Sequence, residues 1–216
     1  MSEPTLRITE TFLSLQGEAA TAGYPTAFIR LTGCPLRCYY CDSEYAFHGG
    51  EKFSVAQLLQ KTAAMRARHV CVTGGEPLAQ PNCLQLLTSL CDQGYCVSLE
   101  TSGAMDISDV DERVSIVMDI KTPASGEVHR NRWENLPLLK QKDQIKFVIC
   151  QRSDFDWACM KIDEHDLTDS VSDLWFSPEY ERVSPTELAK WVIESGRQVR
   201  FQIQMHKILW GDKPGV

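Results

Sequence analysis

Apolar positions along the chain follow two periods in turn, one typical of strands and one typical of helices. Residues 6–12 alternate between apolar and polar side chains, and residues 26–32 are largely apolar, so both segments are predicted to be strands. Further short apolar segments predict strands at residues 69–73, 95–100, 115–120, 144–150, 174–177 and 198–205. A polar tail is expected after the last strand.

Helix signals lie between several of these strands. Ser54 and Gln57 form a capping-box pair that predicts a helix start. Farther along, apolar residues recur at helical spacing before Gly94, at positions 83, 86, 87, 90 and 91. Two more helices are predicted, one over residues 153–165 with Asp156 at the capping-box position, and one that begins at Ser184.

The alternation of strands and helices predicts an α/β fold with a mostly parallel sheet. The sequence holds no internal repeat, low-complexity segment or linker, so residues 1–216 are expected to form one domain. In parallel sheets, binding sites form at the carboxyl ends of the strands. Polar or glycine-rich motifs follow predicted strands at residues 34–43, 74–77 and 101–103, and at Lys121 and Ser177. We therefore expect a single active site at that edge of the sheet.

Composition and charge narrow the classes of function. The 216 residues carry a formal net charge of −7, whereas a non-specific nucleic-acid binder is normally basic, so no nucleic-acid partner is expected. No apolar run approaches the roughly 20 residues that span a bilayer. Residues 1–10 lack the basic and apolar regions of a secretory signal. We therefore expect a cytoplasmic protein without a membrane partner.

The nine cysteines divide into two groups. Cys34, Cys38 and Cys41 cluster in a loop after the second predicted strand, and in a reducing compartment such a cluster indicates metal ligands. The other cysteines are expected to be small core residues, at positions 71, 83, 91, 96, 150 and 159. A structural zinc site with His48 as fourth ligand is one interpretation of the cluster, although no second pair of closely spaced cysteines accompanies it.

A [4Fe–4S] cluster is the interpretation that the spacing favours. Such a cluster normally takes four cysteines, so three leave one iron open to an exogenous ligand. The amino and carboxylate groups of S-adenosylmethionine can fill that position, and the site then needs backbone close to the methionine. Gly74 and Gly75 permit a close approach, and Glu76 or a nearby carbonyl can accept a hydrogen bond from the ammonium group.

The cysteine spacing, with the aromatic Tyr40 before the last cysteine, resembles the signature of the radical S-adenosylmethionine superfamily, and residues 74–77 resemble its methionine-binding motif. Nearly the whole chain is similar to one of its families, the 7-carboxy-7-deazaguanine synthases, through motifs at residues 15–18, 30, 41–43, 100–103, 119–123 and 206–211. This resemblance implies a lyase of queuosine biosynthesis that converts 6-carboxy-5,6,7,8-tetrahydropterin to 7-carboxy-7-deazaguanine with loss of ammonia. It also implies a shortened, incomplete (β/α) barrel, since 216 residues are too few for eight units.

The resemblance further implies roles for individual residues. Cys34, Cys38 and Cys41 would bind the [4Fe–4S] cluster, and Ser43 would bind Mg²⁺ at a position where the family often has threonine. The residues that would contact S-adenosylmethionine are Tyr40, Cys41, Asp42, Gly74, Gly75, Glu76, Gly103, Gln144, Ile145, Lys146 and Ser177. The residues that would contact the substrate are Leu15, Gln16, Gly17, Glu18, Arg30, Thr101, His206 and Val216.

Partners and mechanism follow from the same resemblance. It implies a homodimer, a small-molecule pterin substrate and an electron donor such as a flavodoxin or ferredoxin. Our hypothesis is that the radical derived from the cofactor removes a hydrogen atom from C6 of the pterin, after which the ring contracts and an amine is lost.

Two other classes stay open. A glycyl-radical activating enzyme shares the cysteine spacing, but residues 15–18 and Arg30 argue against it because it would need no pterin contacts. An iron–sulfur sensor or a zinc-binding interaction protein would have no reason to place residues 74–77 and Thr101 at neighbouring strand ends.

Overall fold

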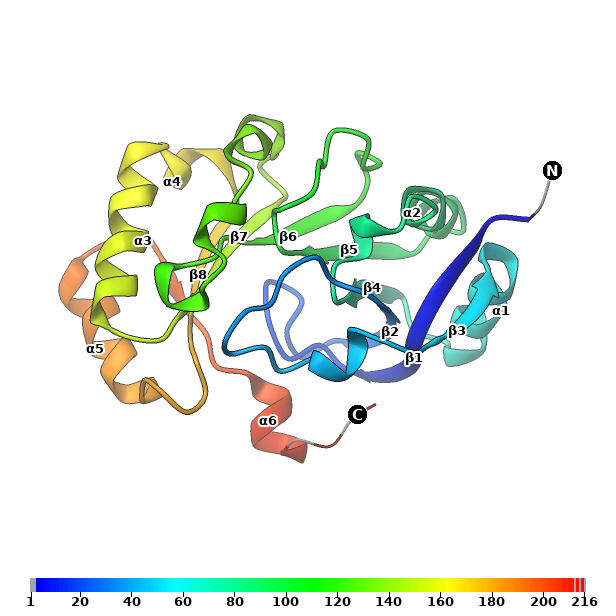
Figure 1. Cartoon of the computed structure of the whole chain (residues 1–216), viewed down its shortest axis with the longest axis horizontal. Helices are drawn as coiled ribbons and strands as arrows, with labels where there is room; N and C mark the ends of the chain where they lie inside the picture. Colours follow the sequence, from blue (N-terminus) through cyan, green and yellow to red (C-terminus); the bar gives the residue numbers. More distant parts are fainter. Residues whose placement is uncertain (1–2, 212, 214, 216) are drawn as a thin grey trace.

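The computed structural model describes residues 3–211, 213 and 215, in which one sheet is flanked by helices (Figure 1). The sheet has the strand order β3-β1-β2-β4-β5-β6-β7-β8-β9. The strands are β1 (Thr5–Leu15), β2 (Pro25–Leu31), β3 (Glu51–Ser54), β4 (His69–Gly74), β5 (Cys96–Thr101), β6 (Ser115–Asp119), β7 (Gln144–Ile149), β8 (Asp173–Pro178) and β9 (Arg200–Phe201). Within the described residues the end strands β3 and β9 do not pair with each other, so the sheet is an open, incomplete barrel as predicted.

Most strand pairs are parallel, but the N-terminal edge is not. β2 pairs parallel with β4, and every following pair of neighbouring strands, from β4 with β5 to β8 with β9, is also parallel. β1 pairs antiparallel with both β2 and β3. The short loop of residues 16–24 explains this, because a parallel pair would need a long crossover between β1 and β2. β3 was not predicted.

Most helices lie between successive strands along the chain, and they cover the sheet. They are α1 (Val55–Met65), α2 (Cys83–Asp92), α3 (Arg152–Glu164), α4 (Leu167–Ser170), α5 (Pro185–Ser195) and α6 (Met205–Trp210). Short 3₁₀ turns lie in the loops, η1 (Glu44–Ala46), η2 (Pro77–Ala79), η3 (Pro123–Ser125), η4 (Val128–Arg130) and η5 (Trp133–Leu138). None of these helices has the length and apolar character needed to cross a bilayer.

Helix starts confirm two predictions and correct a third. Ser54 and Gln57 form the predicted capping box of α1, and the Ser184 side chain accepts from the Glu187 amide at the start of α5. The helix predicted over residues 153–165 is confirmed as α3, but its capping box with Asp156 was wrong, because α3 begins at Arg152 without a side-chain cap. Asp154 instead accepts from backbone amides outside the helix, at Ala124 and Cys150.

The structure also corrects the prediction for the C-terminal segment. A strand was predicted over residues 198–205, but β9 contains only Arg200 and Phe201. The chain then leaves the sheet and forms α6, where a polar tail was predicted. The predicted contact of Val216 falls outside the described residues.

Two apolar clusters pack the helices onto the sheet. One joins β1, β2, β4 and β5 to α1 and α2, and the other joins β6, β7 and β8 to α3 and α5. Of the scattered cysteines, those at positions 71, 83, 150 and 159 are buried and Cys91 is half-buried. Cys96 is exposed, so its prediction as a core residue was wrong. Both clusters fix the strands whose carboxyl ends carry the predicted site.

Candidate active site

A cavity of about 480 Å³ lies at the carboxyl ends of the parallel strands, as the sequence predicted. Most of the predicted site residues line it, namely Leu15, Gln16, Gly17, Glu18, Arg30, Cys34, Cys38, Tyr40, Cys41, Asp42, Ser43, Gly74, Gly75, Thr101, Lys146, Ser177 and His206. Residues that are far apart in the sequence thus share one space, which is the arrangement expected of a single site.

The cysteine loop follows β2 directly, and its three thiols line the cavity in a half-buried state. Burial raises the pKa of all three thiols, that of Cys38 to about 11. The neutral thiol is therefore favoured until a bound metal supplies the charge that holds a thiolate. The Leu36 amide donates to Cys34 Sγ at 3.5 Å, a kind of contact that tunes iron–sulfur clusters.

The arrangement of the thiols distinguishes a cluster from a single ion. In the part of the chain that the structure describes, no three His, Cys, Asp or Glu side chains converge where one metal ion could bind. A structural zinc site requires such convergence, and the zinc alternative with the exposed His48 has no support. In a [4Fe–4S] cluster each cysteine binds a different iron, so thiols spread around one cavity fit this group.

Glycine at positions 74 and 75 allows β4 to pass close to the cysteine loop. A Cβ on Gly74 would lie 2.4 Å from the Leu31 carbonyl oxygen, and one on Gly75 would lie 2.3 Å from that of Gly33. The Glu76 amide donates to the same Gly33 oxygen at 2.9 Å. The two glycines therefore keep the predicted methionine-binding turn against the cluster-binding loop.

The Glu76 side chain does not line the cavity, so of the two acceptors predicted for the ammonium group, Glu76 or a nearby carbonyl, the structure favours the carbonyl. It is fully buried, and its two oxygens accept from the Leu78 amide, the Thr101 hydroxyl, and the amide and hydroxyl of Ser102 at 2.5–3.0 Å. Since these donors occupy the carboxylate, Glu76 joins the end of β4 to the end of β5.

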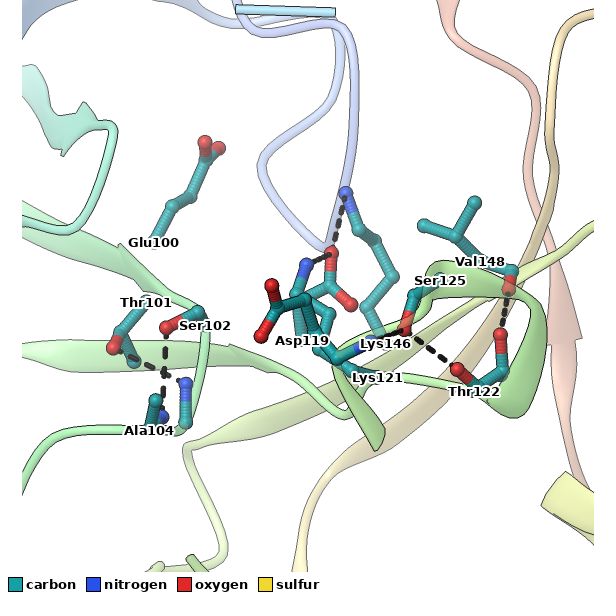
Figure 2. Close-up of polar contacts among 12 residues, drawn as sticks. Glu100, Thr101, Ser102, Ala104, Asp119, Lys121, Thr122, Ser125, Lys146 and Val148 are labelled. Carbon is teal, nitrogen blue, oxygen red and sulfur yellow. Dashed lines mark hydrogen bonds and ion pairs between the residues drawn. The ribbon is translucent and has the colours of Figure 1, made fainter. Parts of the chain in front are cut away.

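Charged side chains gather at the ends of β6 and β7. Figure 2 shows Lys121 and Lys146 directed toward Asp119, with Nζ–Oδ2 distances of 3.1 and 3.9 Å. Burial works to lower the pKa of each lysine, but the acidic groups around it together outweigh this effect, chiefly Asp119 at Lys121 and Glu18 with Asp119 at Lys146. Both pKa values are therefore raised and both ammonium groups stay charged. Asp119 Oδ1 and the Tyr40 hydroxyl are buried without a hydrogen-bond partner in the described residues. Unpaired polar atoms beside a cavity fit a polar bound group.

Glu18 and Asp42 connect the site to the C-terminal segment. Lys146 Nζ donates to Glu18 Oε2 at 2.8 Å, and Gln204 Nε2 donates to Glu18 Oε1 at 3.1 Å and to Asp42 Oδ2 at 3.2 Å. Burial raises the pKa of both carboxyls, but the charge of Lys146 and the hydrogen bonds that each carboxyl accepts together outweigh it, so both pKa values are lowered. Both groups are therefore carboxylates that accept hydrogen bonds.

Arg30 lies next to Asp42 through Ser43, and its Nε atom is held by Glu10. Arg30 Nε donates to Glu10 Oε1 at 2.8 Å, and the Tyr45 hydroxyl donates to the same oxygen at 2.9 Å. Arg30 Nη1 lies 3.5 Å from Ser43 Oγ, which itself donates to Asp42 Oδ1 at 2.9 Å. Among the described residues Nη2 of the guanidinium has no hydrogen-bond partner, so this edge can meet an anion next to a hydroxyl.

Besides Glu76, three predicted cofactor contacts do not line the cavity. Ile145 is fully buried in the apolar core, and Gln144 Oε1 accepts from the Ala20 amide and Trp175 Nε1. Gly103 packs against Met118, whose Cγ would be 3.0 Å from an added Cβ. The Ile145 side chain thus serves packing and that of Gln144 serves hydrogen bonds within the fold, while Gly103 has only backbone atoms to offer a ligand.

Sequence reasoning did not assign several residues that build the site. Glu100 accepts from Gln16 Nε2 at 3.2 Å and from the Thr73 hydroxyl at 2.9 Å. Asp119 pairs with the two lysines, and Gln204 donates to the carboxylates of Glu18 and Asp42. Glu100 and Asp119 belong to motifs noted in the sequence, so their place after strands was an available signal. Gln204 had none, because it lies in a segment predicted as strand.

Comparisons with known proteins agree with this site. Residues 28–123 match the Radical SAM superfamily. The 7-carboxy-7-deazaguanine synthase of Koribacter versatilis is 40% identical over 219 residues, which cover 95% of this chain and 97% of that protein. The one from Chlorobaculum tepidum is 38% identical over 219 residues, which cover 100% and 99%. The crystal structure of QueE from Escherichia coli has the same fold, with a TM-score of 0.76 and 24% identity, and the match covers 94% of this chain and 95% of that one.

Fold, cysteine loop and superfamily match together define a radical S-adenosylmethionine enzyme, which works with a [4Fe–4S] cluster and S-adenosylmethionine. Because its similarity to the relatives extends over nearly the whole length of both proteins, the chain belongs to the 7-carboxy-7-deazaguanine synthase family.

Proposed function

We propose that this chain converts 6-carboxy-5,6,7,8-tetrahydropterin to 7-carboxy-7-deazaguanine with loss of ammonia, a carbon–nitrogen lyase reaction of queuosine biosynthesis. The observation that carries the proposal is one cavity that joins the three-cysteine loop to Arg30 and Ser43. Two relatives at 40% and 38% identity are named for this product. When bound, the cluster and S-adenosylmethionine supply the removal of a hydrogen atom from an unactivated carbon.

The amide-like edge of the pterin is proposed to meet residues 16–18 and Thr101. Glu18 is ionised, so it accepts from the N–H groups of that edge. Gln16 is oriented by Glu100 and by the Gly17 amide. Thr101 already donates its hydroxyl hydrogen to Glu76, so it can only accept from the substrate. His206 packs on Gly17 and adds a further polar group.

The substrate carboxylate is proposed to lie between Arg30 and Ser43, with Mg²⁺ bound there. Mg²⁺ prefers hard oxygen ligands and keeps several waters. The Ser43 hydroxyl sits beside the free edge of the guanidinium, where one carboxylate can meet both the cation and the metal. In this arrangement the chain orients the anion and leaves C6 of the pterin facing the cofactor.

S-adenosylmethionine is proposed to lie along the cysteine loop and the ends of β4, β7 and β8. Cys41, Asp42, Lys146 and Ser177 line this part of the cavity. Tyr40 does so with a buried hydroxyl. The backbone of Gly74 and Gly75 lies close to the start of the cluster-binding loop, at Gly33 and Cys34. These contacts would place the methionine on the open iron and the adenosine over the strand ends.

A conversion assay tests the proposal. Purified protein is reconstituted anaerobically and incubated with the carboxytetrahydropterin, S-adenosylmethionine, Mg²⁺ and dithionite. We expect 7-carboxy-7-deazaguanine in the mass spectrum, and none with Cys38→Ser. Cleavage of S-adenosylmethionine without this product would contradict the proposal and favour a glycyl-radical activating enzyme.

The proposal also covers the electron donor, the cellular compartment and the oligomeric state of the protein. We propose that residues 1–216 act as one radical SAM domain, in the cytoplasm, with a one-electron donor such as a flavodoxin or ferredoxin. The free state of all nine cysteines supports a reducing compartment. A homodimer is supported by exposed apolar side chains at β1 and α6, where Leu13 and Trp210 line a shallow pocket with Pro25.

A further inference from the structure

The pairing of β1 with β2 contains one irregularity, and it lies next to the site. The two strands are antiparallel neighbours (Figure 1), with Ile8 opposite Leu31 and Glu10 opposite Arg30. Thr9 is thus an extra residue on β1, a β-bulge, which shifts the alternation of side chains by one position. Ile8 lies in the apolar core, so without the bulge Glu10 would face the core as well. The bulge therefore turns Glu10 to the face of the sheet that carries Arg30.

Glu10 holds the Arg30 guanidinium at one of its nitrogen atoms. Arg30 Nε donates to Glu10 Oε1 at 2.8 Å, and the two side chains are only 17% and 20% exposed. Salt screens such a shielded pair less than it screens a pair at the surface. Arg30 lines the cavity, whereas Glu10 lies outside its lining. Glu10 is therefore placed to act on a bound ligand through Arg30.

Tyr45 ties Glu10 to the loop that carries Ser43. It lies in η1, two residues after Ser43, and its hydroxyl donates to Glu10 Oε1 at 2.9 Å. Arg30 Cζ lies 5.8 Å from the centroid of the Tyr45 ring and 6.0 Å from that of Phe12, within the range of cation–π contacts. One carboxylate oxygen and two aromatic rings thus restrict the rotation of the guanidinium.

The occupied Nε atom decides how an anion can pair with Arg30. A carboxylate can pair with a guanidinium side-on, through Nε and Nη2, or end-on, through both Nη atoms. Because Glu10 holds Nε, the end-on approach is the one that remains. Nη1 lies 3.5 Å from Ser43 Oγ, so a carboxylate bound end-on also lies next to the hydroxyl proposed as a ligand of Mg²⁺.

We infer that Glu10 is a positioning residue for the substrate: with Tyr45 it holds the Arg30 guanidinium so that the pterin carboxylate pairs end-on, beside Ser43. The inference rests on the proposed function, because it assumes a carboxylated pterin at Arg30. Glu10 itself contributes orientation, which a misaligned guanidinium would lose. The loss of Glu10 should therefore weaken the binding of carboxylated pterins and spare pterins without a carboxylate.

Binding of two stable pterins tests this inference. 6-Carboxypterin, the oxidised form of the proposed substrate, and pterin, the same ring without the carboxylate, are titrated by calorimetry into the reconstituted protein with Mg²⁺ and S-adenosylmethionine. KM and kcat for the carboxytetrahydropterin are measured alongside, with dithionite as reductant. The variants are Glu10→Ala, Glu10→Gln and Tyr45→Phe. The control is Glu51→Ala, which removes an exposed carboxylate from β3 of the same sheet.

The dissociation constant of 6-carboxypterin should rise about tenfold in Glu10→Ala, as for the loss of one charged contact, and that of pterin should change by less than about twofold. KM should rise by a similar factor, and kcat should change less. Glu10→Gln keeps the oxygen that accepts from both Arg30 and Tyr45, so it should cost less than about threefold. Tyr45→Phe should cost about two- to threefold alone and nothing further in Glu10→Ala, because the hydroxyl acts through Glu10. Glu51→Ala should match the parent.

Three results would overturn the inference. Unchanged binding of 6-carboxypterin in Glu10→Ala would show that Arg30 needs no support. Equal losses for both pterins would make Glu10 a support of the whole pocket, and a Glu10→Gln variant as weak as Glu10→Ala would show that charge and not position matters. If Glu10→Ala does not fold, Glu10→Gln and Tyr45→Phe carry the same comparison of the two pterins, and equal losses for both pterins in Tyr45→Phe would be decisive.

The two arms also separate this inference from the proposed function. A parent protein that binds 6-carboxypterin more tightly than pterin but forms no 7-carboxy-7-deazaguanine would overturn the proposed function and leave the role of Glu10 to the binding data. A parent that forms the product, with variants that bind both pterins as the parent does, would overturn only the inference.

Discussion

At the scale of residues, the hydroxyl of Ser43 lies between a carboxylate and a guanidinium, the place proposed for Mg²⁺. Ser43→Ala removes the oxygen ligand, so the Mg²⁺ concentration for half-maximal activity should rise about tenfold. That corresponds to the roughly 1.4 kcal/mol of one modest polar contact. Ser43→Thr keeps the oxygen and adds a methyl group that stiffens the side chain, so it should match or improve on the parent. A Mg²⁺ titration of initial rates measures this, and equal curves for Ser43→Ala and the parent would remove Ser43 from the metal site.

Glu76 gives a second residue-scale prediction. Its buried carboxylate accepts hydrogen bonds only from N–H and O–H groups. In glutamine an NH₂ group replaces one of the two oxygens, and its hydrogens would then face these donors. Glu76→Gln should therefore lower the free energy of unfolding by about 1.5–3 kcal/mol. Urea unfolding measures the change, with Glu112→Gln as control because that side chain is 83% exposed. Equal stability of the two variants would contradict the role of Glu76 as a link between β4 and β5.

Prediction from sequence located side chains in the cavity correctly where they lie at the end of a strand or just after it. Cys34, Arg30 and Thr101 could be placed because parallel strands end at one edge of the sheet. It failed where the hydrogen-bond acceptors of a side chain are occupied by residues that lie nearby only in the folded chain. Glu76 and Gln144 belong to this group, since their acceptors are filled by residues distant in the sequence.

At the scale of elements, the ion pair of Glu18 and Lys146 joins the loop after β1 to β7. Folding lowers the pKa of Glu18 below its ordinary value of 4.5, because Lys146 outweighs the effect of burial. This contribution to stability is thus present above pH 4.5 and is lost as pH falls through the lower folded-state value. The urea midpoint should therefore fall with pH below 4.5, and the fall should be smaller in Glu18→Gln. Identical pH profiles for parent and variant would show that Glu18 does not contribute.

Elements with strong local signals were predicted correctly, and those set by distant contacts were not. The capping box of α1 and the apolar face of α2 are local, and both were confirmed. The C-terminal strand was predicted from alternating apolar residues, which fits extended chain in general. In the structure, Gln202 and Gln204 turn toward Glu18, so the chain leaves the sheet after Phe201 to bond the site.

At the scale of the whole molecule, the proposed homodimer can be tested at the exposed apolar surface of β1. Leu13 is 49% exposed beside Trp210, and a buried carboxylate at that position would oppose association. Leu13→Glu should sediment as a monomer at concentrations where the parent is a dimer. Ile193→Glu, at a side chain on α5 that is 78% exposed, should leave the dimer intact. A monomeric parent, or a dimeric Leu13→Glu, would contradict the proposed interface.

The central claim is that Cys34, Cys38 and Cys41 hold a [4Fe–4S] cluster whose open iron binds S-adenosylmethionine in the cavity. Electron paramagnetic resonance of the anaerobically reconstituted, reduced protein tests this most directly, together with its iron content. We expect about four irons per chain and a signal that changes when S-adenosylmethionine is added. Cys96→Ser should retain both properties, because that cysteine is exposed away from the loop, whereas Cys38→Ser should lose them. One tightly bound zinc per chain, or a cluster signal indifferent to S-adenosylmethionine, would contradict the claim.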